Sequence, residues 1–149
     1  MYVPTLADAD YARLLALRTR LRGFVHWSED QAKAAGLTAA HHQLLLAVRG
    51  HGDPRGPTIG DVADYLFLRH HSTVGLVDRA EAAGLVRRTR DAEDGRVTRL
   101  VLTRLGEKLL RDLSERHLDE LRRLAAHLQP LLRGLEVEQV DHGGSRAGP

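Results

Sequence analysis

The chain has no cysteine among its 149 residues, and only 4% of them are aromatic. The absence of cysteine excludes disulfides, thiolate zinc sites and cysteine nucleophiles. No apolar run reaches the roughly 18 residues that a membrane-spanning helix needs, so we expect no membrane contact. The N-terminus lacks the basic and then apolar pattern of a signal peptide, so we expect a cytoplasmic protein.

Motifs of the common enzyme classes are absent as well. The sequence contains no G-x-S-x-G nucleophile motif, no glycine-rich phosphate loop and no H-E-x-x-H zinc motif. Paired carboxylates fall only in segments that we expect to be solvated. We therefore expect neither catalysis nor a cofactor.

Positive charge is concentrated in one segment. The net charge is only +2, so the molecule as a whole attracts nucleic acid weakly. Segment 87–104, however, carries six arginines against three acidic residues. Arginine suits bidentate phosphate and base contacts. The scarcity of lysine decides nothing, because a GC-rich genome would produce the same bias.

The hydrophobic pattern predicts a mainly α-helical fold with one small β-hairpin. Asp94-Gly95 is the hairpin signal, and Leu66–Leu68 is apolar enough that we expect it to pack inside. Pro130 predicts a break or kink. The predicted helices are 7–35, a helix that starts after the N-cap Thr38 and ends in the turn-rich segment 50–57, 59–65 behind a Thr58–Asp61 capping box, 70–83, a long helix behind Thr103, and a short one at 131–137; the predicted strands are 85–90 and 97–102.

A short helix, a tight connection, a second helix and a hairpin, in that order, indicate a winged helix-turn-helix. In this fold the N-terminal half of the second helix enters the major groove of DNA. Arginine at a hairpin tip suits the minor groove, and Asp94 is placed to orient Arg96 by an ion pair. The predicted contacts are Arg69, His70, His71, Ser72, Thr73, Gly75 and Arg79 on the helix, and Arg88, Arg90, Asp94 and Arg96 on the hairpin.

Three segments resemble the signature of the MarR family of bacterial regulators. They are Gly84-Leu85-Val86-Arg87-Arg88, Asp94-Gly95-Arg96 and Leu102-Thr103-Arg104-Leu105-Gly106. Segment 72–79 also resembles the family's recognition helix, and the resemblance covers roughly residues 6–137. The chain departs from the family at Gly75, where a polar residue is usual, and at Ala80–Ala83, where a Leu-Glu pairing is commoner.

The resemblance implies a homodimeric regulator that binds a near-palindromic operator in double-stranded DNA. It implies one domain over 1–137, with dimerisation helices at 7–35 and 104–137, a DNA-binding lobe at 38–103 and a disordered tail at 138–149. The leucine stripe from Leu105 to Leu128 independently favours a helix that packs on a partner. A winged-helix module that binds only other proteins is the alternative.

The resemblance also implies a repressor that a small aromatic or anionic effector releases from DNA. The candidate ligand-binding residues are Phe24, Trp27, His41 and His42, with His26 nearby. Trp27 is equally compatible with an ordinary core position. A metal-responsive regulator of the same fold is a further alternative, although neighbouring histidines point about 100° apart on a helix and seldom share a site. Its donors would come from His41, His42, Glu29, Asp30, Asp112 and His117.

Overall fold

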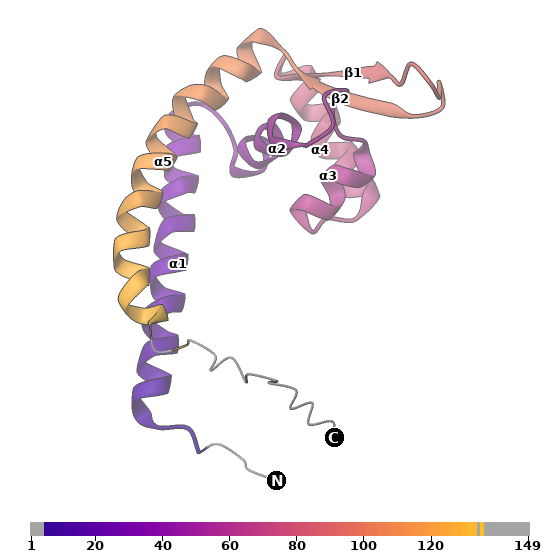
Figure 1. The fold of residues 1–149 in the computed structure, drawn as a ribbon. Coiled ribbons are helices and arrows are strands. Elements are labelled where there is room, and N and C mark those ends of the chain that lie inside the picture. The colour runs from indigo at the N-terminus through magenta and orange to yellow at the C-terminus, as the bar shows by residue number, and fades with distance from the viewer. Residues whose placement is uncertain (1–4, 134, 136–149) are drawn as a thin grey trace, which may run out of the picture.

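The computed structural model describes residues 5–133 and 135, which form five helices and one two-stranded sheet. Helices α1 and α5 lie side by side as a long stalk, and the other elements form a lobe at one end of it (Figure 1). The predicted helical fold with a hairpin is confirmed. The bounds are α1 Asp8–Ala34, α2 Ala39–Gly50, α3 Ile59–Leu66, α4 His70–Ala82, β1 Val86–Arg90, β2 Thr98–Leu102 and α5 Arg104–Leu132.

Threonine side chains begin three of the helices, as the sequence predicts. Thr38 Oγ1 accepts the His41 N–H at the start of α2, and Thr103 accepts the Gly106 N–H at the start of α5. Thr58 and Asp61 form the reciprocal pair of hydrogen bonds that defines a capping box at α3. These bonds satisfy N–H groups that a helix leaves unpaired in its first turn.

The lobe packs its helices and the hairpin around one apolar core. Leu44 and Leu45 of α2, Val62 of α3, Val77 of α4 and Leu100 of β2 are each fully buried there. The hairpin pairs Val86 with Leu102 and Arg90 with Thr98. The loop before α3 adds a bridge from Thr58 to Arg99 and a hydrogen bond from the Leu100 N–H to the Pro57 carbonyl, which ties the hairpin to the helices.

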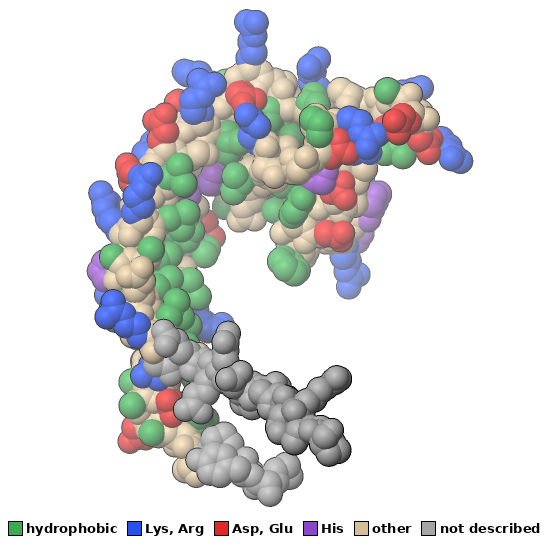
Figure 2. Space-filling model, in the orientation of Figure 1, with side chains coloured by type: hydrophobic (Ala, Val, Ile, Leu, Met, Phe, Trp, Pro, Cys, Tyr) green, Lys and Arg blue, Asp and Glu red, His purple; other side chains and the backbone are tan. Residues whose placement is uncertain are grey.

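The stalk is much less buried than the lobe. Ala32 is the buried residue of α1, and the buried residues of α5 are Gly106, Leu110 and Leu113. Hydrophobic side chains gather along the inner face of the stalk, the face turned toward the lobe, whereas Lys and Arg lie mainly on its outer face (Figure 2). Neither helix of the stalk is long and apolar enough over its described residues to cross a membrane.

One expectation about packing is wrong. Phe67 is 96% exposed and does not pack inside, because it ends α3 in the left-handed conformation, with φ at 54°.

The break expected near Pro130 does not occur either. Helix α5 continues through Pro130 to Leu132, so no separate helix begins at Leu131. The rest of the predicted helix 131–137 and the predicted tail 138–149 lie almost entirely outside the described residues.

Candidate nucleic-acid interface

The N-terminal turn of α4 presents a polar surface. His70, His71 and Ser72 are exposed, as is Arg69, the residue before the helix. On the opposite side, Leu76, Val77 and Ala80 are buried against the lobe core. This division leaves imidazole, hydroxyl and guanidinium groups free at the end of the helix where unpaired N–H groups also favour anions.

Thr73 does not belong to that surface. It is fully buried, and its hydroxyl donates to the Arg69 carbonyl at 3.0 Å. The prediction that it contacts DNA is therefore wrong in this structure. Its neighbour Ser72 supplies the exposed hydroxyl.

Gly75 makes room for an arginine of its own helix. A Cβ atom built on Gly75 would lie 3.3 Å from Nη1 of Arg79, four residues and about one turn later. Arg79 is exposed, so its guanidinium lies over the position where a side chain at Gly75 would be. The structure thus places the guanidinium of Arg79 where α4 has no side chain, at Gly75.

Arg88 forms ion pairs with two residues of its own chain. Its guanidinium forms ion pairs with Asp78, at 2.5 Å, and with Glu81, at 2.7 Å, both on α4. Its backbone N–H also donates to Glu81, and this bond lowers the pKa of the Glu81 carboxyl from its ordinary value. Arg88 therefore fixes β1 against α4 and has little freedom to contact another molecule.

The turn of the hairpin carries the Asp94–Arg96 pair that the sequence predicts. Asp94 Oδ1 accepts from the backbone N–H and from Nε of Arg96, at 3.0 and 3.2 Å. The Arg96 side chain is 91% exposed, and Arg90 at the end of β1 is exposed as well. The hairpin thus holds one arginine at its tip by a short local ion pair.

Below this turn lies a cluster that sequence reasoning missed. Asp91, 7% exposed, forms ion pairs with Arg99 and Arg55, and Arg55 also pairs with Asp53 at 2.7 Å. Hydrogen bonds from the backbone N–H of Glu93 and from Arg99 hold the pKa of Asp91 down at about 2. The alternation of residues along the strands does not predict this cluster. The acid-rich segment 91–94, which lies between arginines, is the one feature of the sequence that points to it.

Comparison with known proteins identifies the fold and a family to which the chain is similar. The sequence profile of the MarR family matches residues 35–97. Over 88 residues the chain is 31% identical to the HTH-type transcriptional regulator YfiV of Bacillus subtilis, and the match covers 59% of this chain and 53% of that one. A MarR family protein from Bacillus stearothermophilus superposes with a TM-score of 0.67 at 26% identity, covering 84% of each chain. Over residues 35–97 the chain is therefore similar to the MarR family.

A solved complex of another fold relative contains DNA. The MepR–DNA complex of Staphylococcus aureus has a TM-score of 0.64 at 19% identity and covers 73% of this chain and 77% of its own. At that identity the likeness concerns the fold alone. The chain spans about half the length of the curated relative YfiV, so the activity of the whole protein is taken up below as a proposal.

The segments that resemble the MarR signature have a physical basis in this structure. Gly106 must lack a side chain, because a Cβ there would lie 2.1 Å from the Leu85 carbonyl oxygen. Thr103 caps α5 and also donates through Oγ1 to the Gly84 carbonyl. Gly84 itself ends α4 with φ at 74°. The signature residues therefore join α4, the hairpin and α5 into one rigid unit.

The protein also has a cavity of about 450 Å³ where the lobe meets the stalk. Phe24 and His42 line it, together with Ser28 and His117, so two of the four predicted ligand-binding residues meet there. His117 lies 2.7 Å from the Ser28 hydroxyl through Nε2 and 2.7 Å from the Leu113 carbonyl through Nδ1. Burial and the neighbouring His117 lower the pKa of His42.

The other two predicted ligand-binding residues lie elsewhere. Trp27 is not among the residues that line this cavity; it packs beside it, with its ring centroid 6.1 Å from Phe24 and 4.8 Å from His117. His41 lines a separate groove with Lys33 and Leu85. Within the described residues, no three His, Asp or Glu side chains come together as a metal site would require.

Proposed function

We propose that this protein is a transcriptional regulator of the MarR family that binds double-stranded DNA in a sequence-specific manner. The observation that carries the proposal is the pairing of two exposed polar features on one rigid lobe: the N-terminal turn of α4 and the arginine at the hairpin tip. An α-helix fits the major groove, and an arginine fits the adjacent minor groove. The DNA complex of MepR, a protein of the same fold, supports this assignment.

The exposed residues divide into three roles. His70, His71 and Ser72 contact base edges, because they stand at the end of the recognition helix. Arg69, Arg79 and Arg90 contact phosphates and set the register. Arg96 enters the minor groove, oriented by Asp94.

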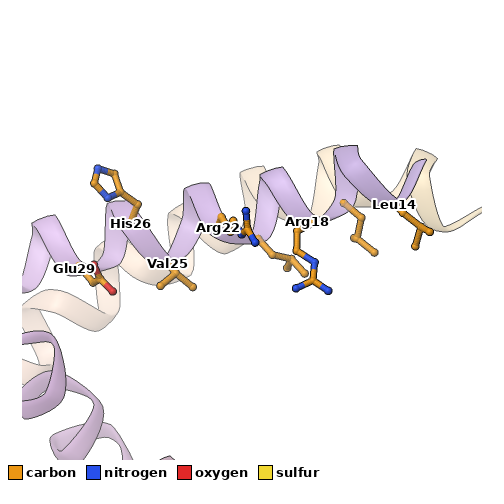
Figure 3. Close-up of a pocket in the computed structure, with 8 residues that line it drawn as sticks. Leu14, Arg18, Arg22, Val25, His26 and Glu29 are labelled. Carbon is orange, nitrogen blue, oxygen red and sulfur yellow. The ribbon is translucent and has the colours of Figure 1, made fainter. Parts of the chain in front are cut away.

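We propose further that the DNA-binding species is a homodimer formed through the stalk. Leu14 and Leu21 of α1 and Leu118 of α5 are all between 45% and 57% exposed, which leaves more apolar surface uncovered than is usual for a monomer. A groove follows the same part of α1, where Arg18 and Val25 point to one side and His26 to the other (Figure 3). A second copy of the chain packs on these leucines. The resulting dimer presents two DNA-binding lobes, each formed by residues 38–103 of one copy, to a near-palindromic operator.

The cavity between lobe and stalk is the proposed effector site, and its occupation releases a repressor from DNA. Phe24, Leu46, Leu118 and Leu121 supply apolar walls for a small aromatic ring, and His42 and His117 supply polar groups for an anionic substituent. Because α1, α2 and α5 all line the cavity, a bound molecule changes how the lobe sits on the stalk.

Selection from a pool of random-sequence duplexes tests the DNA-binding proposal. The full chain is expected to enrich a near-palindrome whose half-sites lie about 10–10.5 base pairs apart, or a multiple of that spacing. Enrichment of no sequence, with no salt-dependent binding to any duplex, would instead favour a module that contacts only proteins.

Ser72→Ala is expected to change which bases are enriched at one position of each half-site. The matched control is Thr19→Ala, which removes an exposed hydroxyl from α1, outside the proposed DNA-binding surface and outside the proposed effector cavity. If Ser72→Ala weakens binding to all sequences equally, its hydroxyl contacts the phosphate backbone only.

A further inference from the structure

Asp91 stands at the junction between the hairpin turn and the rest of the lobe. Its Oδ1 accepts the backbone N–H groups of Glu93, at 2.8 Å, and Asp94, at 3.2 Å. Its Oδ2 accepts from Arg99 Nε at 2.5 Å and from Arg55 Nη1 at 3.2 Å. One buried carboxylate therefore holds the turn with one oxygen and two arginines with the other.

The two arginines connect Asp91 to the helical part of the lobe. The Arg99 side chain is only 13% exposed and also donates to the Gly56 carbonyl at 2.9 Å. Gly56 has φ at 90°, and a Cβ there would lie 2.0 Å from the Leu100 carbonyl oxygen, so loop and strand touch directly. The hairpin is thus fixed to the loop between α2 and α3 as well as to its own strands.

The fold of the turn depends on this carboxylate more than on its glycine. Seven residues separate β1 from β2, too many for a two-residue Asp-Gly turn. Gly95 is not among the residues with positive φ, so its conformational freedom is not used. The turn closes instead through the Val97 N–H to the Asp94 carbonyl and the Asp91 N–H to the Val97 carbonyl, with the Asp91 side chain inside it.

A chain of hydrogen bonds then leads from Asp91 to the exposed arginine. Asp91 holds the Asp94 N–H, and the Asp94 carboxylate holds both the backbone and the guanidinium of Arg96. An exposed arginine with no such support loses much of its rotamer freedom when it binds. A turn that already holds Arg96 before binding makes this loss of rotamer freedom smaller.

We infer that Asp91 is a positioning residue for DNA binding, which holds the hairpin turn so that Arg96 meets the minor groove in a prepared orientation. The inference rests on the proposed function, because it assumes that Arg96 contacts DNA. Asp91 itself is buried and contacts no nucleic acid. Its effect on affinity passes entirely through Arg96.

A double-mutant cycle between Asp91→Asn and Arg96→Ala tests this. The probe is the duplex that the wild-type chain enriches from the random pool, and all four proteins are measured on it. Asp91→Asn is expected to weaken binding by about three- to tenfold when Arg96 is present, the effect of losing one or two hydrogen bonds. In the Arg96→Ala background it is expected to have almost no effect. Equal losses in both backgrounds would overturn the inference.

Glu107→Gln is the matched control, because it also converts a carboxylate paired with an arginine into an amide. Glu107, in the first turn of α5, pairs with Arg49 of α2 at 3.0 Å and lies near Leu102, at the end of β2 that is remote from the hairpin turn. Its effect on duplex affinity is expected to be the same whether or not Arg96 is present. If it couples to Arg96 as strongly as Asp91→Asn does, the coupling reflects charge alone and the inference fails.

Amide hydrogen exchange provides a measurement without DNA. Exchange of the Glu93 and Asp94 amides is expected to accelerate in Asp91→Asn, and unchanged rates would contradict the inference. If wild type enriches no duplex while these amides respond, the proposed function fails and the role in the turn remains. Should Asp91→Asn not fold, Arg55→Gln replaces it: this side chain is 45% exposed, and a smaller coupling of the same sign is expected.

Discussion

Gly106 lies where the first turn of α5 crosses the start of the hairpin. Leu85 offers its carbonyl oxygen there to the Thr103 N–H at 3.1 Å, and this bond sets how closely the helix approaches. A methyl group on Gly106 would overlap that oxygen and push α5 away from the lobe. The absence of a side chain at Gly106 therefore determines how α5 of the stalk packs on the lobe.

Gly106→Ala is expected to lower the free energy of unfolding by about 1–3 kcal/mol, the usual cost of overpacking a tight contact. Gly60→Ala is the control, since a Cβ there meets only the Thr58 hydroxyl at an ordinary 3.7 Å. Alanine is the better helix former by up to about 1 kcal/mol, so the control is expected to be stabilised or unchanged. Urea unfolding measures both, and a Gly106→Ala protein as stable as wild type would contradict the packing account.

At the scale of single residues, the sequence predicts capping and local ion pairs well. The Thr58–Asp61 box and the Asp94–Arg96 pair involve partners two or three residues apart, so spacing alone reveals them. The prediction that Thr73 lies on the exposed side of α4 is wrong. A small polar residue in the first turns of a helix can either face solvent or donate a hydrogen bond to a carbonyl of the preceding turn, and Thr73 does the second. The rotation of the helix on the core decides between the two, and no local pattern encodes it.

At the scale of elements, the hairpin behaves as a unit held by carboxylates. Bonds from arginines and backbone N–H groups lower the pKa of Asp53, Asp91 and Asp94. A carboxyl with a lower pKa in the folded than in the unfolded chain stabilises the fold above its unfolded pKa of about 3.9. That stabilisation is lost as the pH falls through the folded pKa.

The stability difference between wild type and Asp91→Asn is therefore expected to shrink as the pH falls from 5 toward 2, the pKa of folded Asp91. Protonated Asp91 is uncharged, as asparagine is, so the free energies of unfolding of the two proteins converge. Urea midpoints measured across this range test the expectation. A difference that stays constant with pH would mean that the charge of Asp91 does not matter to folding.

The cavity between lobe and stalk also loses stability as the pH falls, but it does so in a higher pH range. Burial and His117 lower the pKa of His42, so the unfolded chain takes up a proton at a higher pH than the folded one. Stability from this group is complete above about 6.5 and declines as the pH falls below that value. His42→Gln is expected to flatten the fall in stability between pH 7 and 5. His26→Gln, with a side chain 79% exposed, is the control and is expected to leave that fall unchanged.

The sequence predicts the order and type of the elements within one or two residues at most ends. It misses how loops join them: the cluster of Asp91 with Arg55 and Arg99 links residues up to 44 positions apart, from Arg55 to Arg99. Phe67 was expected inside because it is apolar, yet the left-handed end of α3 turns it outward. Long-range contacts determine the first outcome, and the local backbone conformation at the end of α3 determines the second.

At the scale of the whole molecule, the uncovered apolar face of the stalk is the main feature still to be explained. The leucine stripe in the sequence indicates a helix with a partner. Helices α1 and α5 pack on each other, yet α1, which is described over its whole length, buries only Ala32. The inner side keeps exposed leucines on both helices. A second copy is the proposed cover.

Leu21→Glu is expected to convert the dimer to a monomer, because a charge buried between two apolar helices is costly to desolvate. Leu68→Glu is the control: Leu68 is 39% exposed against 45% for Leu21, but it lies on the lobe, between α3 and α4. Sedimentation velocity distinguishes the two species. Two variants with the same mass as wild type would refute dimerisation through this face.

The most direct test of the whole account is the affinity of wild type and Arg96→Ala for the enriched duplex as salt is varied. Wild-type affinity is expected to fall steeply and linearly on logarithmic axes, with Arg96→Ala weaker by about 1–3 kcal/mol and its slope reduced by up to about one. An affinity independent of salt, or an Arg96→Ala protein that binds as tightly as wild type, would contradict DNA reading by this lobe.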